Sequence, residues 1–313
     1  MSIAQKKSIL KTYSLHRLYL LTLFFVLTSF CSLAKSVSSP PIDSTAIKER
    51  LELQLMAEFT NNPIVTSYET KRDTVLSKKV IYEEKINSIV TYKIYHDGTI
   101  NKIIPSLIAK QFENKYRYIY VDSKGYKHNL GDFTIHRTQV YRGEPGEMIN
   151  LIDLEEVPKS YKKGTHQYHF IMDSPRSFVN EQTLASFFGA MLEVNYLDIG
   201  CNGFSHEDGS SRPSRSHING INGDFKYLRT DKSIECGSGT SLNLIKEPQA
   251  LDFDRQNKWN DALYKFGWKG MLGWTVTIDN ETKYLNNITH KTSNHYHHLH
   301  VQEYEPEINE IQQ

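Results

Sequence analysis

The stretch NEQTLASFFGAMLEVNYLDI, residues 180–199, decides how the second half of this chain folds. Four apolar residues in it recur at the i, i+3, i+4 and i+7 spacing of one helical face: Leu184, Phe187, Phe188 and Met191. This spacing predicts an amphipathic helix over residues 180–193. The apolar residues that follow predict a strand over residues 194–199, so a helix leads directly into a sheet.

The sequence after this stretch predicts a loop, a second helix and two closing strands. Residues 200–217 are polar and rich in Gly and Ser, which indicates a loop. Residues 254–266 predict a helix that ends at Gly267. Its apolar face carries four residues: Trp259, Ala262, Leu263 and Phe266. Residues 273–279 and 297–304 predict strands, and the irregular order of helices and strands indicates the α+β class.

The first half of the chain is β-rich over residues 78–173, where apolar and polar residues alternate and turn signals recur. Asp97-Gly98 predicts a hairpin turn, and a second hairpin turn ends at Gly125. We predict that residues 43–173 form a β-rich region of unknown role, which opens with a helix over residues 43–59. Five histidines are scattered through this half, and we interpret them as surface or strand-face residues: His96, His128, His136, His166 and His169.

Residues 1–34 have the pattern of a secretory signal peptide. Basic residues precede the apolar run LYLLTLFFVLTSF (18–30), and CSLA (31–34) places small residues where a signal peptidase cleaves. An uncleaved membrane anchor is the alternative, because the run is close to the lower length limit for spanning a bilayer. Cleavage predicts an exported protein without stable membrane insertion, in which residues 35–42 are a linker.

Cleavage would also change the charge and the cysteine content. The leader holds four of the 37 basic residues and none of the 36 acidic ones, so residues 35–313 carry a net charge of −3. This mildly acidic balance offers no electrostatic reason to expect a nucleic-acid partner. Two cysteines remain, Cys201 and Cys236, and such a pair in an exported chain predicts a disulfide. Two free buried thiols are the alternative.

The stretch NHYHHLHVQEY, residues 294–304, concentrates four histidines within six residues. If its second half is a strand, Leu299 faces the core while His298 and His300 face the other way, roughly 7 Å apart. One of these two can then bind a metal ion while the other remains available for proton transfer. His297 falls on the Leu299 face and is the expected bystander. A hydrated histidine-rich strand is the alternative.

A second stretch, SRSHINGINGDFKYL (214–228), offers complementary ligands. His217 and Asp224 are good zinc ligand types, and Gly220 and Gly223 between them allow the backbone to turn sharply. A lone His and a lone Asp in such a loop are also ordinary turn formers or solvated groups. The pair therefore supports a zinc site only when it is combined with the histidine tract.

Taken with His300, this pair makes three protein ligands, the number that catalytic zinc sites use. Zinc in such a site lowers the pKa of a water towards about 7 and polarises a carbonyl. His298 would take the proton of that water and pass it to the leaving amine.

These two stretches resemble the motifs of a known family. SHINGINGD (216–224) is similar to the Ser-His-x-x-Gly-x-(Asp/Asn)-x-Asp motif of the penicillin-insensitive murein endopeptidases. HYHHLHV (295–301) is similar to their closing His-x-x-His-x-His-Val motif. These enzymes belong to the wider group that contains lysostaphin-type and D-Ala-D-Ala metallopeptidases and the hedgehog signalling domain.

The resemblance implies a hedgehog- or D-Ala-D-Ala-peptidase-like domain over residues 174–313, with a central antiparallel sheet. It implies one zinc ion per chain, held by three ligands: His217, Asp224 and His300. It implies that His298 is the catalytic base or transition-state stabiliser and that His295 is a second active-site histidine. The implied substrate is the peptide part of bacterial peptidoglycan, and the implied compartment is the periplasm.

We therefore expect an exported zinc peptidase that hydrolyses bonds in peptidoglycan stem peptides or cross-links. A D,D- or L,D-carboxypeptidase and a non-catalytic zinc-binding recognition module of the same fold are alternatives. A third is a β-rich wall- or partner-binding protein whose C-terminal site is incidental. Arg212 and Arg215 can pair with a stem-peptide carboxylate, or they are solvated loop residues. The sequence does not indicate an oligomeric state.

Overall fold

Helix α4 (Glu181–Val194) forms where the sequence predicts it in the computed structural model, which describes residues 88–313. The side chain of Asn180 caps its first turn by accepting a hydrogen bond from a backbone N–H. At the other end Asn195 adopts the left-handed conformation (φ 58°), and its N–H donates to the carbonyl of Met191. Asn180 and Asn195 therefore determine where the helix begins and ends.

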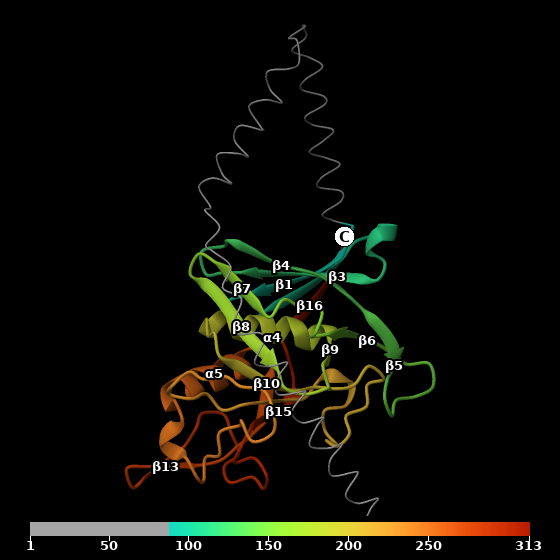
Figure 1. Cartoon of the computed structure of the whole chain (residues 1–313). Helices are drawn as coiled ribbons and strands as arrows, with labels where there is room; N and C mark the ends of the chain where they lie inside the picture. The colour runs from blue at the N-terminus through green and yellow to red at the C-terminus, as the bar shows by residue number, and fades with distance from the viewer. Residues whose placement is uncertain (1–87) are drawn as a thin grey trace, which may run out of the picture. The chain divides into compact units, whose positions relative to one another are not determined.

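Ten consecutive residues of helix α4, residues 183–192, are buried, because successive side chains contact different layers. Phe187 faces the six-stranded sheet, Phe188 faces the five-stranded sheet, and Gly189 lies against the ring of Phe266. Ring centroids lie 5.4–6.4 Å apart: Phe170, Phe225 and Trp259 around Phe187, and Tyr118 and Phe133 around Phe188. Burying each phenylalanine contributes roughly 1.5–3 kcal/mol. Figure 1 shows α4 between the two layers of strands.

The five-stranded sheet has the strand order β16-β2-β1-β3-β4. Its strands are β1 (Val90–Tyr95), β2 (Ile100–Ile104), β3 (Lys115–Val121), β4 (Lys127–Thr134) and β16 (Ile308–Gln312). The hairpins predicted at Asp97-Gly98 and before Gly125 join β1 to β2 and β3 to β4, so both predictions are confirmed. Strand β16 pairs in parallel with β2, so the two ends of the described chain meet in this sheet (Figure 1).

The six-stranded sheet has the strand order β12-β15-β11-β10-β8-β7. Its strands are β7 (Ser160–Lys163), β8 (His166–Met172), β10 (Ile199–Gly203), β11 (Gly223–Phe225), β12 (Trp268–Leu272) and β15 (Leu299–Tyr304). Strands β12, β15, β11 and β10 pair as antiparallel neighbours. Strand β8 joins β10 in parallel, so this sheet crosses the boundary predicted between residues 173 and 174. Residues on both sides of that boundary belong to one compact unit.

Helix α5 (Phe253–Lys265) packs beside α4 and follows the prediction closely. Asp252 caps its first turn through a side-chain hydrogen bond, and all four predicted apolar residues are buried. Gly267 ends the helical segment with a φ of +120°. The remaining elements are two small sheets and three short 3-10 helices: β5 (His136–Gln139), β6 (Met148–Asp153), β9 (Phe178–Asn180), β13 (Val276–Ile278), β14 (Glu281–Lys283), η1 (Lys110–Phe112), η2 (Ile218–Gly220) and η3 (Pro248–Ala250).

The strand predicted over residues 194–199 is wrong for most of its length. Helix α4 extends to Val194, and the left-handed Asn195 starts a turn, so strand β10 begins only at Ile199. The predicted loop over residues 200–217 likewise begins only after Gly203. The turn at residues 195–198 therefore delays the strand, and the strand in turn delays the loop.

Residues 88–313 form a mixed, sheet-rich α and β structure with two α-helices. This agrees with the predicted α+β class in general terms. The predicted signal peptide (1–34), linker (35–42) and helix (43–59) lie outside the described residues. Among residues 88–313, no helix is long and apolar enough to cross a membrane.

Candidate metal centre

His217 is positioned by a tight loop that leads into strand β11. It lies immediately before η2 and is buried. Asn219 anchors this loop, because its side-chain amide accepts from the backbone N–H of Tyr141 at 2.7 Å and donates to the carbonyl of the same residue at 3.3 Å. Gly220 has a φ of +68°, and a Cβ there would lie 2.5 Å from the backbone nitrogen of Asn180. The predicted sharp turn at Gly220 is confirmed, and only glycine fits it.

Asp224 and His300 are brought together by strand pairing. Asp224 is the central residue of β11 and lies directly opposite His300 of β15. Such residues share one face of the sheet, and Nδ1 of His300 lies 2.8 Å from Oδ1 of Asp224. Gly223 does not turn the chain, contrary to the prediction. It lies within β11, where an added Cβ would lie 2.7 Å from the ring of Phe204, so its role is to leave room for that ring.

The three predicted ligands converge on one point. Nε2 of His217 lies 3.0 Å from Nδ1 of His300 and 3.1 Å from Oδ1 of Asp224, and the 2.8 Å contact closes the triangle. Ligand atoms about 3.3 Å apart are expected for a tetrahedral site with bonds of about 2.0–2.1 Å. The triangle is therefore close to one face of such a site. His217 and His300 are 1% and 3% exposed. This group can hold a metal ion.

The electrostatics of the group favour an ionised Asp224 and a neutral His217. Burial raises the pKa of the Asp224 carboxyl, but hydrogen bonds from His217 and His300 outweigh burial and hold the pKa well below its usual value. Burial also lowers the pKa of His217, although Asp224 opposes this. An ionised carboxylate beside a neutral imidazole is the protonation state that binds metal ions.

His298 and His295 lie beside this group. Nε2 of His298 is 3.5 Å from Oδ1 of Asp224, and the ring of His295 lies 4.9 Å from that of His298 and 5.7 Å from that of His300. Burial lowers the pKa of His298 to about 4 against the opposing effect of Asp224, so its ring is neutral at pH 7. His297, the expected bystander, contacts His298 with a distance of 2.8 Å between their Nδ1 atoms. Strand alternation does not apply to His297, because β15 begins two residues later.

Two residues that sequence reasoning missed contact the outer nitrogens of the ligand histidines. Oγ of Ser216 lies 3.4 Å from Nε2 of His300, which suits a ligand histidine that binds metal through Nδ1. Arg176 donates from Nη1 to Nδ1 of His217 at 2.9 Å, and its Nη2 lies 3.7 Å from Oδ2 of Asp224. Arg176 lies 41 residues before His217, outside both motifs, so no spacing in the sequence links them.

The Arg176 contact has a chemical consequence for His217. A guanidinium can only donate, so Nδ1 of His217 accepts and its proton is on Nε2. A metal ion bound through Nε2 requires the proton on Nδ1, where it would face the arginine. Arg176 therefore competes with a metal ion for His217.

Arg212 and Arg215 are exposed and line a hollow of about 810 Å³ together with Arg142. The hollow reaches Ser214, whose hydroxyl lies 3.4 Å from that of Ser216 beside the ligand group. Three arginines next to a candidate metal centre provide a surface on which a carboxylate can be bound.

The predicted disulfide between Cys201 and Cys236 does not form in the structure. Cys201 is buried in the hydrophobic core, where burial raises the pKa of its thiol to about 12. Cys236 is exposed, and its thiol donates to the carbonyl of Met172 at 3.8 Å. One thiol therefore points into the core while the other lies on the surface.

The fold also assembles a second group from histidines that we interpreted as scattered surface or strand-face residues. His128 is buried, and its ring lies 4.5 Å from that of His166, beside Asp122. Asp122 and His128 flank the predicted hairpin turn, which is a weak local signal. The sequence contains no signal that brings His166 to them, because it belongs to a different sheet.

Comparisons of this chain with protein-family models, with curated proteins and with solved structures find no match.

Proposed function

We propose that this chain is an exported zinc peptidase that hydrolyses peptide bonds in peptidoglycan stem peptides or their cross-links. The triangle formed by His217, Asp224 and His300, with sides of 2.8–3.1 Å, carries the proposal. Two imidazoles and one carboxylate suit zinc, and three protein ligands are typical of catalytic zinc sites. The likeness of both motifs to the murein endopeptidases supports a hedgehog- or D-Ala-D-Ala-peptidase-like fold, the substrate class and a periplasmic location.

Zinc held by these three side chains would supply a Lewis acid that polarises a peptide carbonyl and acidifies a water. His298 is the proposed base. When its Nδ1–H is directed to His297, its Nε2 carries the lone pair and lies at the edge of the ligand group. The Asp224 carboxylate, 3.5 Å away, would stabilise the imidazolium that forms when His298 takes up a proton.

The arginine-lined hollow is the proposed site for a carboxylate of the stem peptide. Arg212 and Arg215 precede the first ligand by only a few residues, and both are exposed. A substrate carboxylate bound between them would position the neighbouring peptide bond relative to the metal centre.

A digest of purified cross-linked muropeptides tests the proposal. The zinc-loaded chain is compared with Asp224→Ala, His298→Ala and, as a matched control, His290→Ala. We expect the wild type and His290→Ala to convert cross-linked dimers to monomers. We expect Asp224→Ala to bind zinc more weakly, and His298→Ala to retain zinc but to lose at least about 100-fold in turnover.

The products distinguish the alternatives. Loss of a terminal alanine in place of dimer cleavage would indicate a D,D- or L,D-carboxypeptidase. Zinc bound without any cleavage would contradict a peptidase and indicate a recognition module of the same fold. Wild-type turnover in His298→Ala would remove this residue as the base.

A further inference from the structure

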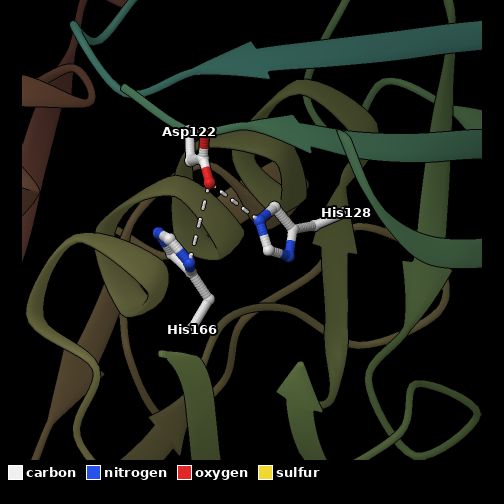
Figure 2. A group of neighbouring side chains, drawn as sticks. All are labelled: Asp122, His128 and His166. Carbon is white, nitrogen blue, oxygen red and sulfur yellow. Dashed lines mark hydrogen bonds and ion pairs between the residues drawn. The ribbon is translucent and has the colours of Figure 1, made fainter. Parts of the chain in front are cut away.

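The turn between β3 and β4 places a carboxylate beneath the five-stranded sheet. Asp122 is 6% exposed and directly follows β3. Its Oδ1 accepts hydrogen bonds from the backbone N–H groups of Lys124 and Tyr126, both at 2.9 Å. These bonds fix the carboxyl group in the turn and leave Oδ2 directed towards two imidazoles (Figure 2).

Those imidazoles come from two different sheets. Nε2 of His128, in β4, lies 3.3 Å from Oδ2 of Asp122. Nδ1 of His166, the first residue of β8, lies 3.9 Å from the same oxygen. Figure 2 shows both rings directed at this one carboxylate oxygen. The three ligand atoms lie within 4.8 Å of one another.

Hydrogen bonding alone explains only part of this arrangement. A distance of 3.9 Å is too long for a hydrogen bond, so His166 is directed at Asp122 without bonding to it. A metal ion between the three atoms would account for the convergence, because ligand atoms about 3.3 Å apart fit bonds of about 2.0–2.1 Å. The His128–Asp122 distance already has this value, and Nδ1 of His166 would need to move less than 1 Å closer to Oδ2 of Asp122 to match it.

The outer contact of His128 also suits a ligand. Its Nδ1 lies 3.1 Å from the hydroxyl of Tyr161 in β7, and a phenol oxygen can accept a hydrogen bond. With the proton on Nδ1, Nε2 carries the lone pair that faces Asp122. This is the tautomer that binds a metal ion, and such outer contacts are typical of ligand histidines. The Tyr161 hydroxyl can donate or accept, so it permits this tautomer of His128, whereas the Arg176 guanidinium can only donate to His217.

We propose that Asp122, His128 and His166 bind a second divalent transition-metal ion, with zinc as the best fit to two imidazoles and a carboxylate. Its role is structural. Asp122 lies in the turn after β3 and His128 in β4 of the five-stranded sheet, while His166 belongs to the six-stranded sheet, so the ion cross-links the two layers on either side of α4. The ion therefore stabilises the chain by mass action, independently of catalysis.

Zinc stoichiometry of four proteins tests this inference: wild type, Asp224→Ala, His166→Ala and the double variant. We expect two, one, one and no tightly bound zinc ions per chain. His169→Ala, which removes another imidazole of β8, is the matched control and should retain two. A double variant that binds as much zinc as Asp224→Ala would overturn the second site. If the first group binds no zinc, wild type and Asp224→Ala should both bind one ion, and His166→Ala none, so the two proposals fail separately.

Two further readouts guard against a folding defect in the variants. Cobalt bound to the Asp224→Ala variant should give a visible absorption band. The band should be lost when the same chain also carries a second substitution, either His166→Ala or His166→Gln. Zinc at 100 times its Kd should raise the unfolding midpoint of Asp224→Ala by roughly 5–10 °C. An equal rise in the double variant would contradict the cross-link.

Discussion

Replacing Arg176 by glutamine is expected to tighten metal binding at the His217–Asp224–His300 group. Arg176 donates to Nδ1 of His217 and so stabilises the tautomer that carries its proton on Nε2, the nitrogen required for the metal. A hydrogen bond from a charged donor contributes about 1.5–3 kcal/mol, which converts to a decrease in Kd of about 10- to 150-fold when only the competing form loses it. The side-chain oxygen of a glutamine can instead accept from Nδ1–H and so favour the ligand tautomer.

The assay is a competition for zinc against a chromophoric chelator at constant pH. The His166→Ala background restricts the titration to this one group. Arg176→Lys is the control, because it keeps a positive charge and a donor, and its Kd should stay close to that of the parent chain. Arg176 also donates to the carbonyl of Asn202 at 3.0 Å, so its replacement could disturb the fold. Circular dichroism checks this, and the spectrum of each variant should match that of the parent. A Kd for Arg176→Gln that is unchanged or higher would refute the competition between Arg176 and the metal.

Three further predictions concern stability. Gly189→Ala adds a Cβ that would lie 2.3 Å from the buried ring of Phe266, so an overpacking cost of about 1–3 kcal/mol should exceed the helix-propensity gain of about 0.5–1 kcal/mol; a rise in the denaturant midpoint would contradict this. Burial raises the pKa of Glu181 against the opposing charge of Lys102, so the folded chain holds this proton more tightly than the unfolded chain. The unfolding free energy of wild type relative to Glu181→Gln should therefore rise as the pH falls from 7 towards the ordinary glutamate pKa of about 4.3, and a difference that does not vary with pH would exclude this linkage. Asp173→Ala removes the anionic partner of the buried Lys226 ammonium, which lies 2.6 Å away, and leaves it only the neutral acceptors on Glu235 and Thr240, so it should cost about 3–5 kcal/mol. Lys226→Met removes the charge itself and should cost less; equal losses by chemical denaturation would count against this reasoning.

Local signals in the sequence are sufficient for much of this fold. Helices α4 and α5 follow from their apolar spacing and their capping residues, and two hairpins follow from their turn residues. The ligands of the candidate metal centre are also recognisable, because His217 and Asp224 lie on one short loop and strand, and His300 lies on a strand that faces them. In each case the interactions that determine the element or the site join residues close in the sequence or involve a recognisable residue type.

Features that depend on distant contacts are not predictable in this way. The parallel pairing of β8 with β10 has no local signature, so the sequence suggests a boundary near residue 173 that the sheet crosses. Arg176 and His166 are brought beside the two candidate ligand groups only by the packing of whole strands and loops. The predicted disulfide is wrong for a related reason. Long-range packing places Cys201 in the core and leaves Cys236 exposed, and no local pattern in the sequence indicates this.

The pairing of β16 with β2 has a consequence for when the chain can fold. Asn309 and Asn101, which are hydrogen-bonded partners in these strands, are 208 residues apart, so one edge of β2 stays unpaired until residues 308–312 have been synthesised. Contacts of such long range are made late and slowly. If the exported chain proposed here crosses the membrane before it folds, a late closing strand would keep the five-stranded sheet incomplete during transit. Folding would then be completed at the destination, where the proposed zinc would also be bound.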